Sequence, residues 1–144
     1  YKKPEETAKA YDGDGWFRTG DMGYLRADGY LRFLGRYKDM LKIGGENVDP
    51  MEVEAYLIGH SDVVEVAVVG HPDDRLTEVA IAFVVPRAGT APYEEDILNY
   101  CRGRIASFKI PRHILFLPKL PLTSSGKVRK AELREQALAE LHPV

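Results

Sequence analysis

Residues 63–85 have the sequence VVEVAVVGHPDDRLTEVAIAFVV and give the strongest indication of the fold class. Two runs within this segment, 63–69 and 79–85, are rich in β-branched residues, which favour strands. Gly70, Pro72 and Pro86 bound the runs, as expected where strands end. Both runs are therefore predicted to be central strands of a sheet.

Helices are predicted on both sides of these strands along the chain. Asp49 is a suitable cap for a helix that starts at Pro50, and Glu52 lies three residues after that cap. Further helices are predicted over 92–106 and near the C-terminus, where apolar residues recur at helical spacing. The predicted core-facing residues are Val53, Tyr56 and Leu57 in the first helix, Ile97, Leu98, Cys101 and Ile105 in the second, and Leu133, Ala137, Leu138 and Leu141 in the third.

The remaining segments predict short strands. Residues 40–43 and 113–117 are strand candidates, and Gly44-Gly45 marks a turn after the first. Closer to the N-terminus, a short helix after Pro4 precedes extended residues 16–19 and a hairpin of 24–26 with 30–34.

A linker is predicted at 35–39, where a glycine and charged residues interrupt the pattern. The predicted domains are 1–36 and 37–144. The expected fold class is α+β: a small mixed β-sheet covered by about three helices, preceded by a short hinge and a β-hairpin.

Bulk composition excludes several classes of function. At 144 residues, the chain suffices for one domain with an appendage. A net charge of -2, from 20 basic and 22 acidic residues, gives no field that favours nucleic acid or an anionic membrane. Cys101 is the single cysteine, so no intramolecular disulfide forms, in keeping with a cytoplasmic location. No membrane span or signal peptide is predicted, and the absence of an initial Met is consistent with a fragment.

Four polar or glycine-rich patterns lie between the apolar segments: FRTGD at 17–21, GRYKD at 35–39, KIGGEN at 42–47 and PLTSSGK at 121–127. Asp21 could accept two hydrogen bonds from a ribose diol, or could be a turn residue. Arg36 could bind phosphate or ribose through its planar guanidinium, or could be a solvated charge. Loops on a rigid scaffold are where functional residues concentrate.

Lys127 lies at the tip of the fourth pattern. Its ammonium could reach a neighbouring site and stabilise negative charge on a transferring phosphate, although an isolated Gly-Lys is more often an exposed turn. The pattern lacks the spacing of a phosphate-binding P-loop. His60, His71 and His113 have no metal-ligand spacing and are interpreted as structural or solvent-facing.

Together, the order and spacing of the four patterns resemble the adenylate-forming superfamily of acyl-CoA synthetases, peptide-synthetase adenylation domains and beetle luciferases. The resemblance covers nearly the whole chain, from YKKPEET at 1–7 through GWFRTGD at 15–21 to the terminal helix. It implies that a carboxylate reacts with ATP to give acyl-AMP and pyrophosphate, and that the acyl group then passes to a thiol. It also implies that 1–36 are the tail of the large AMP-binding domain and 37–144 a mobile C-terminal lid.

The resemblance also implies roles for single residues. Lys127 would be catalytic, because the matching lysine inserts between carboxylate and α-phosphate during adenylation. The lid would then swing about its hinge and present another face to the thiol. The implied assignments are Asp21, Arg36 and Lys127 for ATP, Lys38 for the hinge, Gly44, Gly45 and Glu46 for the pantetheine tunnel, and Arg75, Lys109 and Arg112 for the nucleotide part of CoA.

Two positions depart from the commonest pattern of that family. Thr77 stands where the second glycine of Pro-Asp-x-x-x-Gly-Glu is usual, which puts the backbone shape of this loop in doubt. Asn47 stands where many members have Arg, although Gly-Gly-Glu-Asn occurs in fatty-acyl and related CoA ligases. The sequence therefore favours CoA as the acceptor.

The expected function is thus that of a C-terminal fragment of an ATP-dependent acyl-CoA synthetase, inactive by itself. Its partners would be a carboxylic acid, ATP, CoA and its own missing N-terminal domain. That domain would supply the acid pocket, most of the ATP site and Mg²⁺, for which this chain has no convincing ligand. The alternatives are an adenylation domain of a peptide-synthetase or luciferase-like enzyme, and a non-catalytic interaction module.

Overall fold

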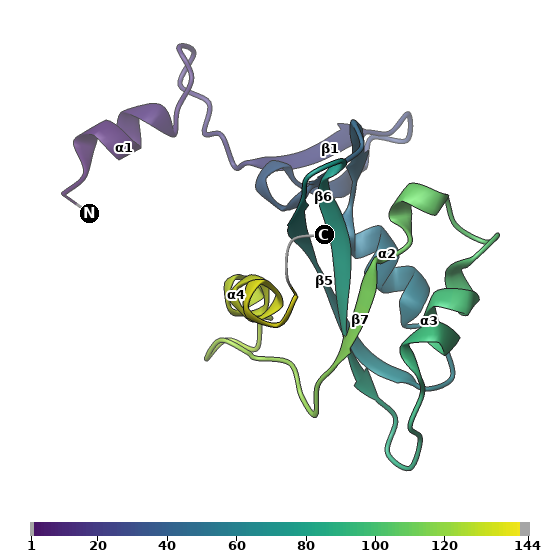
Figure 1. Cartoon of the computed structure of the whole chain (residues 1–144). Helices are drawn as coiled ribbons and strands as arrows, with labels where there is room; N and C mark the ends of the chain where they lie inside the picture. The colour runs from purple at the N-terminus through teal and green to yellow at the C-terminus, as the bar shows by residue number, and fades with distance from the viewer. Residues whose placement is uncertain (1, 142–144) are drawn as a thin grey trace. The chain divides into compact units, whose positions relative to one another are not determined.

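The computed structural model describes residues 2–141, which form two compact units on either side of the Asp39–Met40 bond. The first unit contains helix α1 (Pro4–Lys9), strands β1 (Asp21–Leu25) and β2 (Leu31–Arg36), and a 3-10 turn at Tyr37–Asp39 (Figure 1). Strands β1 and β2 pair antiparallel, which confirms the predicted hairpin.

Two details of the first unit differ from the sequence predictions. Residues 16–19 form no strand, and Phe17 makes only an isolated bridge with Tyr11. Gly35 and Arg36 belong to β2 and are not linker residues. Gly35 is buried opposite Met22 in the ladder, so the glycine continues the strand instead of breaking it.

The second unit is built on a five-stranded mixed sheet with strand order β4-β3-β6-β5, in which β7 also pairs with β6. Only the β6–β7 pairing is parallel. The strands are β3 (Leu41–Ile43), β4 (Glu46–Val48), β5 (Val63–Asp73), β6 (Thr77–Pro86) and β7 (His113–Phe116). Strand β4 was not predicted, since its three residues have little strand character of their own.

Strand β6 is central as predicted, whereas β5 lies at the end of the strand order, so the prediction of a second central strand was wrong. Side chains of β6 alternate between two core clusters: Ala80, Ala82 and Val84 face one, and Val79, Ile81 and Phe83 face the other. Both faces of the sheet are therefore covered. The apolar residues along β5 therefore reflect that both faces of this strand are covered. They do not indicate its position in the strand order.

Three helices cover this sheet, as predicted. Helices α2 (Pro50–Leu57) and α3 (Glu94–Cys101) contribute to the first core cluster, and α4 (Lys130–Glu140) contributes to the second. Figure 1 shows α4 on one side of the sheet and α2 and α3 on the other. The α+β class with a mixed sheet is confirmed.

The predicted helix boundaries were partly wrong. Asp49 caps α2 as expected and accepts a hydrogen bond from the Met51 amide at 2.9 Å. Helix α3 ends at Cys101 and not at 106, because Gly103 has a left-handed φ of +70° and a 3-10 turn follows at Ser107–Lys109. Leu138 is 55% exposed, because α4 buries only the narrow stripe of Leu133 and Ala137.

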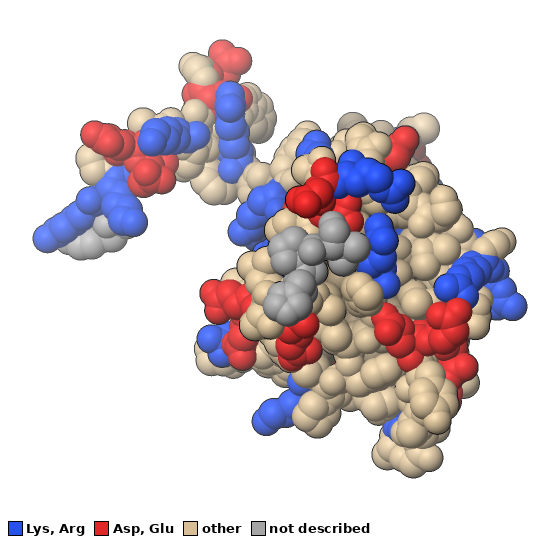
Figure 2. All heavy atoms as spheres, in the orientation of Figure 1, with Lys and Arg blue, Asp and Glu red and all other residues tan. Residues whose placement is uncertain are grey.

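Surface charge agrees with the balanced composition. Basic and acidic side chains are interspersed over the face shown in Figure 2. Within residues 2–141, no helix combines the length and apolar character needed to cross a membrane.

Candidate functional site

Lys127 lies in a small closed loop that precedes α4. An isolated bridge between Leu122 and Val128 closes the loop, and the Thr123 amide donates to the Lys127 carbonyl at 2.7 Å. Gly126 has a φ of +79°, a conformation that glycine adopts without strain. The sequence thus folds locally into a tight turn with Lys127 at its end.

Hydroxyl groups stabilise this loop from within. The Thr123 hydroxyl accepts a hydrogen bond from the Lys127 amide at 3.1 Å and lies 3.0 Å from the Ser125 hydroxyl. The Lys127 side chain is exposed, and its ammonium makes no hydrogen bond or ion pair with any residue that the structure describes. The ammonium is therefore available to an external anion, while its backbone is held.

Asp21 and Arg36 are direct partners in the β1–β2 ladder. The Arg36 Nε donates to Asp21 Oδ1 at 2.8 Å, and both side chains are partly exposed. Thr19 accepts from the Asp21 amide at 3.1 Å, which fixes the turn that leads into β1. The structure thus brings together the two residues predicted to bind the ribose and phosphates.

Lys38, the predicted hinge residue, is exposed in the 3-10 turn directly after β2. The neighbouring Tyr37 amide donates to the Gly20 carbonyl at 3.0 Å. The backbone before Lys38 is therefore held to the hairpin.

The Gly44-Gly45 turn joins β3 to β4, and both glycines have positive φ values, +59° and +88°. The Gly44 amide donates to the Leu76 carbonyl at 2.8 Å, so the turn lies beside the 74–77 loop. The Asn47 side chain accepts from the Lys42 ammonium at 2.9 Å. Glu46 is exposed at the start of β4.

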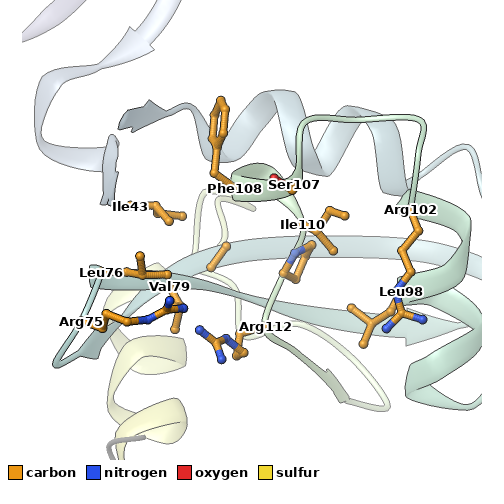
Figure 3. A pocket seen from close by; sticks show the side chains of 12 residues that line it. Ile43, Arg75, Leu76, Val79, Leu98, Arg102, Ser107, Phe108, Ile110 and Arg112 are labelled. Carbon is orange, nitrogen blue, oxygen red and sulfur yellow. The ribbon is translucent and has the colours of Figure 1, made fainter. Parts of the chain in front are cut away.

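Next to this turn is a pocket of about 540 Å³ with an apolar floor and arginines at its rim, called here the arginine-rimmed pocket. Figure 3 shows Arg75 and Arg112 on the same side of the pocket and Arg102 beside Leu98 at the other end. Such a combination suits a ligand with both phosphate and apolar groups. The pocket is lined by Ile43, Arg75, Leu76, Val79, Ala80, Leu98, Arg102, Ser107, Phe108, Ile110, Pro111 and Arg112.

Asp73 organises the loop that carries Arg75. Its carboxylate accepts from the Leu76 amide at 2.8 Å and the Arg75 amide at 3.0 Å, and lies 3.6 Å from Arg112 Nη2. The backbone hydrogen bond from Leu76 lowers the pKa of Asp73 most; the Arg75 amide and the charges of Arg112 and Arg75 act in the same direction, against the effect of burial. The carboxylate therefore stays ionised between the two arginines.

Lys109 does not line the arginine-rimmed pocket. Its ammonium contacts both carboxylate oxygens of Glu52 in α2, at 2.6 and 2.7 Å. Glu52, which lies three residues after the cap, is thus engaged with Lys109, while Asp49 caps the start of α2. Of the three residues predicted for the CoA nucleotide, the structure brings together Arg75 and Arg112 but not Lys109.

Arg102 and Phe108 line the pocket but were not predicted as site residues. The predicted helix over 92–106 placed Arg102 on a helical surface, whereas it follows the end of α3. The left-handed glycine at 103 was the available signal for this earlier helix end.

No metal site is visible in the described part of the chain, where no three His, Cys, Asp or Glu side chains come close enough to hold an ion. His71 is buried, with Nδ1 2.8 Å from the Pro72 carbonyl and Nε2 3.3 Å from the Leu141 carbonyl. Its contacts are structural, as interpreted from sequence.

Comparison with known proteins gives the family of the chain. Residues 52–127, just over half of its length, match the family model of the AMP-binding enzyme C-terminal domain. The 2-methylpropanoate–CoA ligase CCL4 of Humulus lupulus is 44% identical over 138 residues, which cover 94% of this chain and 25% of the ligase.

Solved structures show the same relationship. ATP-bound MatB from Rhodopseudomonas palustris is 38% identical with a TM-score of 0.90, over 95% of this chain and 27% of that protein. A fatty acyl CoA synthetase from Mycobacterium tuberculosis is 45% identical with a TM-score of 0.72, over 94% and 27% of the two chains. The chain thus spans about a quarter of the length of these relatives. It belongs to the family of AMP-binding enzyme C-terminal domains, which are found in adenylate-forming enzymes such as the acyl-CoA ligases.

Proposed function

We propose that this chain is the C-terminal part of an ATP-dependent acyl-CoA synthetase, which converts a carboxylate and ATP to acyl-AMP and pyrophosphate and then forms a thioester with CoA. The observation that carries the proposal is the exposed Lys127 ammonium on a closed loop, within a family whose relatives are CoA ligases. Because the chain spans about a quarter of those relatives, the activity belongs to a longer polypeptide and not to this chain alone.

In the adenylation step, Lys127 inserts its ammonium beside the reacting carboxylate and the α-phosphate. Negative charge that develops there is stabilised by a cation that is already oriented. Asp21 accepts hydrogen bonds from the ribose hydroxyls, and Arg36 binds ribose or phosphate. Their ion pair in the hairpin supports this role because each side chain holds the other in place.

In the thioester step, the domain of residues 37–144 swings at Lys38 and withdraws Lys127, while residues 1–36 stay with the large domain. Gly44, Gly45 and Glu46 then line the pantetheine path, and Arg75 and Arg112 bind the phosphorylated part of CoA. The position of the glycine turn beside the arginine-rimmed pocket supports this assignment. Lys109 takes part only if it leaves Glu52.

The rest of the enzyme supplies the acid pocket, most of the ATP site and the ligands of Mg²⁺, which accompanies ATP. The relatives include a 2-methylpropanoate–CoA ligase and a fatty acyl CoA synthetase, and their names support a carboxylic acid and CoA as substrates here. We propose a cytoplasmic enzyme whose partners are these small molecules and its own N-terminal domain.

The decisive experiment compares Lys127→Ala with the wild type in the complete enzyme. Pyrophosphate release should fall by about 100-fold or more, since the loss of one group that stabilises the transition state commonly costs that much. Thioester formation from pre-made acyl-adenylate and CoA should be retained. Lys119→Ala removes another exposed lysine of the same segment and should change neither step.

Other outcomes would redirect the assignment. Equal loss of both steps, or of neither, would mean that Lys127 is not the adenylation lysine. Adenylation without transfer to free CoA would favour a peptide-synthetase or luciferase-like adenylation domain. A non-catalytic module would tolerate the substitution altogether. Thioester formation by the isolated chain would contradict the proposal that it is only part of the catalytic unit.

A further inference from the structure

An ion pair joins two helices on opposite sides of the sheet in the second unit. Lys130 is the first residue of α4, and its Nζ lies 2.7 Å from Oε1 of Glu54 in α2. The two side chains are only 21% and 20% exposed. An ion pair withdrawn from water to this degree is screened less than a surface pair.

The same carboxylate oxygen also holds the edge of the sheet. Glu54 Oε1 accepts from the Val68 amide at 2.7 Å, and Val68 belongs to the edge strand β5. An edge strand presents backbone groups that lack a strand partner, so this bond satisfies one of them. Lys130 of α4 therefore reaches past the β5 edge to Glu54. The Glu54 carboxylate thus links α4, α2 and β5.

The helix dipole alone disfavours a positive charge at the position of Lys130, the first residue of α4. The N-terminus of a helix carries positive partial charge, which favours acidic and not basic side chains. Arg129, the residue before it, makes no side-chain capping hydrogen bond. The partly buried Lys130 ammonium is thus stabilised at this position by Glu54, and without that partner the start of α4 would lose its attachment to α2.

This attachment lies next to the loop that carries Lys127. The Arg129 amide donates to the Pro121 carbonyl at 2.9 Å and closes the base of the loop. Lys130 follows immediately, three positions after Lys127. The loop is short and closed, so the position of its base sets the position of the Lys127 backbone, from which the ammonium extends.

We propose that Glu54 and Lys130 are positioning residues for Lys127, an inference that rests on the proposed role of Lys127 in adenylation. The ion pair fixes the base of the loop against α2 and β5 and thereby orients the ammonium before substrate binds. It serves the adenylation step alone, because Lys127 is withdrawn during thioester formation.

The mechanical part is tested in the chain itself by NMR. Glu54→Gln keeps an oxygen for the Val68 amide but removes the charge, and Lys130→Met keeps the aliphatic stem. Backbone order parameters of residues 123–127 should fall in both variants from about 0.85 to about 0.6 or lower, while those of β6 stay unchanged. Unchanged order parameters in the loop would overturn the proposal.

The catalytic part is tested in the complete enzyme. In both variants, kcat for pyrophosphate release should fall by about 10-fold to 100-fold, since a displacement of about 1 Å can cost as much. The KM for ATP and the rate of CoA transfer from pre-made acyl-adenylate should stay unchanged. Lys130→Arg, which keeps the positive charge, should restore adenylation.

Glu132→Gln is the matched control. It breaks the exposed Arg129–Glu132 ion pair of 2.9 Å at the same helix start, which makes no link to α2, and should affect neither step. Equal loss of both steps in Glu54→Gln, with a lower Tm, would show a merely structural role and overturn the inference. If only Lys127→Ala impairs adenylation, the inference fails and the proposed function stands; if Lys127→Ala is also silent, both fail.

Discussion

Thr77 has a backbone φ of +72°, in the left-handed region where a β-branched side chain is strained. The backbone keeps a glycine-like conformation there although the sequence has no glycine. We predict that Thr77→Gly raises the free energy of unfolding by about 1 kcal/mol, the relief of about 1–2 kcal/mol of strain less the entropic cost of glycine. Urea unfolding of the chain measures this change.

Thr77→Ala is the control for that prediction, because alanine retains the Cβ atom that causes the strain. It should give little or no gain. Equal stabilisation by both substitutions would place the strain in the threonine side chain and not in the backbone.

Single residues of the site were predictable to different degrees. Lys127 could be proposed as the adenylation lysine from sequence because it closes an ordered series of local patterns, and its role stays a prediction. The contact between Glu54 and Lys130 could not be foreseen, since it joins residues 76 positions apart and depends on how α2 and α4 lie around β5. Local sequence carries the chemistry of a residue, whereas its partner is set by tertiary packing.

The turn between β5 and β6 depends on an ionised carboxylate. The pKa of Asp73 is lowered from its ordinary value of 3.8, chiefly by the Leu76 amide, so its contribution to stability is present above that value and lost as the pH falls through the lowered pKa. We predict that Asp73→Asn destabilises the chain at pH 7 and that the difference from wild type shrinks toward pH 2. Urea midpoints across this pH range test the prediction, and Asp74→Asn, at an exposed neighbour, should show no such trend.

Elements were predictable where one local signal dominated. The cap at Asp49 and the hairpin of the first unit followed from side-chain chemistry and turn residues. The edge position of β5 did not, because helices on both faces give an edge strand the composition of a central one. The end of α3 was misplaced since Ile105 still packs against the core after the helix has ended.

At the scale of the whole molecule, the two units differ in how much apolar surface they bury. Every buried hydrophobic residue lies at or after Leu41, and Gly35 is the sole buried residue among 2–39. The α+β class was predictable because the apolar runs of the second unit are long enough to specify a core. The sequence of the first unit predicts only a hairpin. It does not predict which surface packs against that hairpin.

That contrast predicts where the isolated chain resists hydrogen exchange. A single hairpin is marginal in water, and Trp16, Tyr30 and Leu31 of the first unit are each more than 70% exposed. Slow-exchanging amides should therefore be confined to 40–141, strongest in β6, while β1 and β2 exchange on the timescale of local opening. Equal protection of β2 and β6 would mean that the first unit is stable without further burial. There would then be no reason to expect that the rest of a longer enzyme covers its exposed aromatic residues.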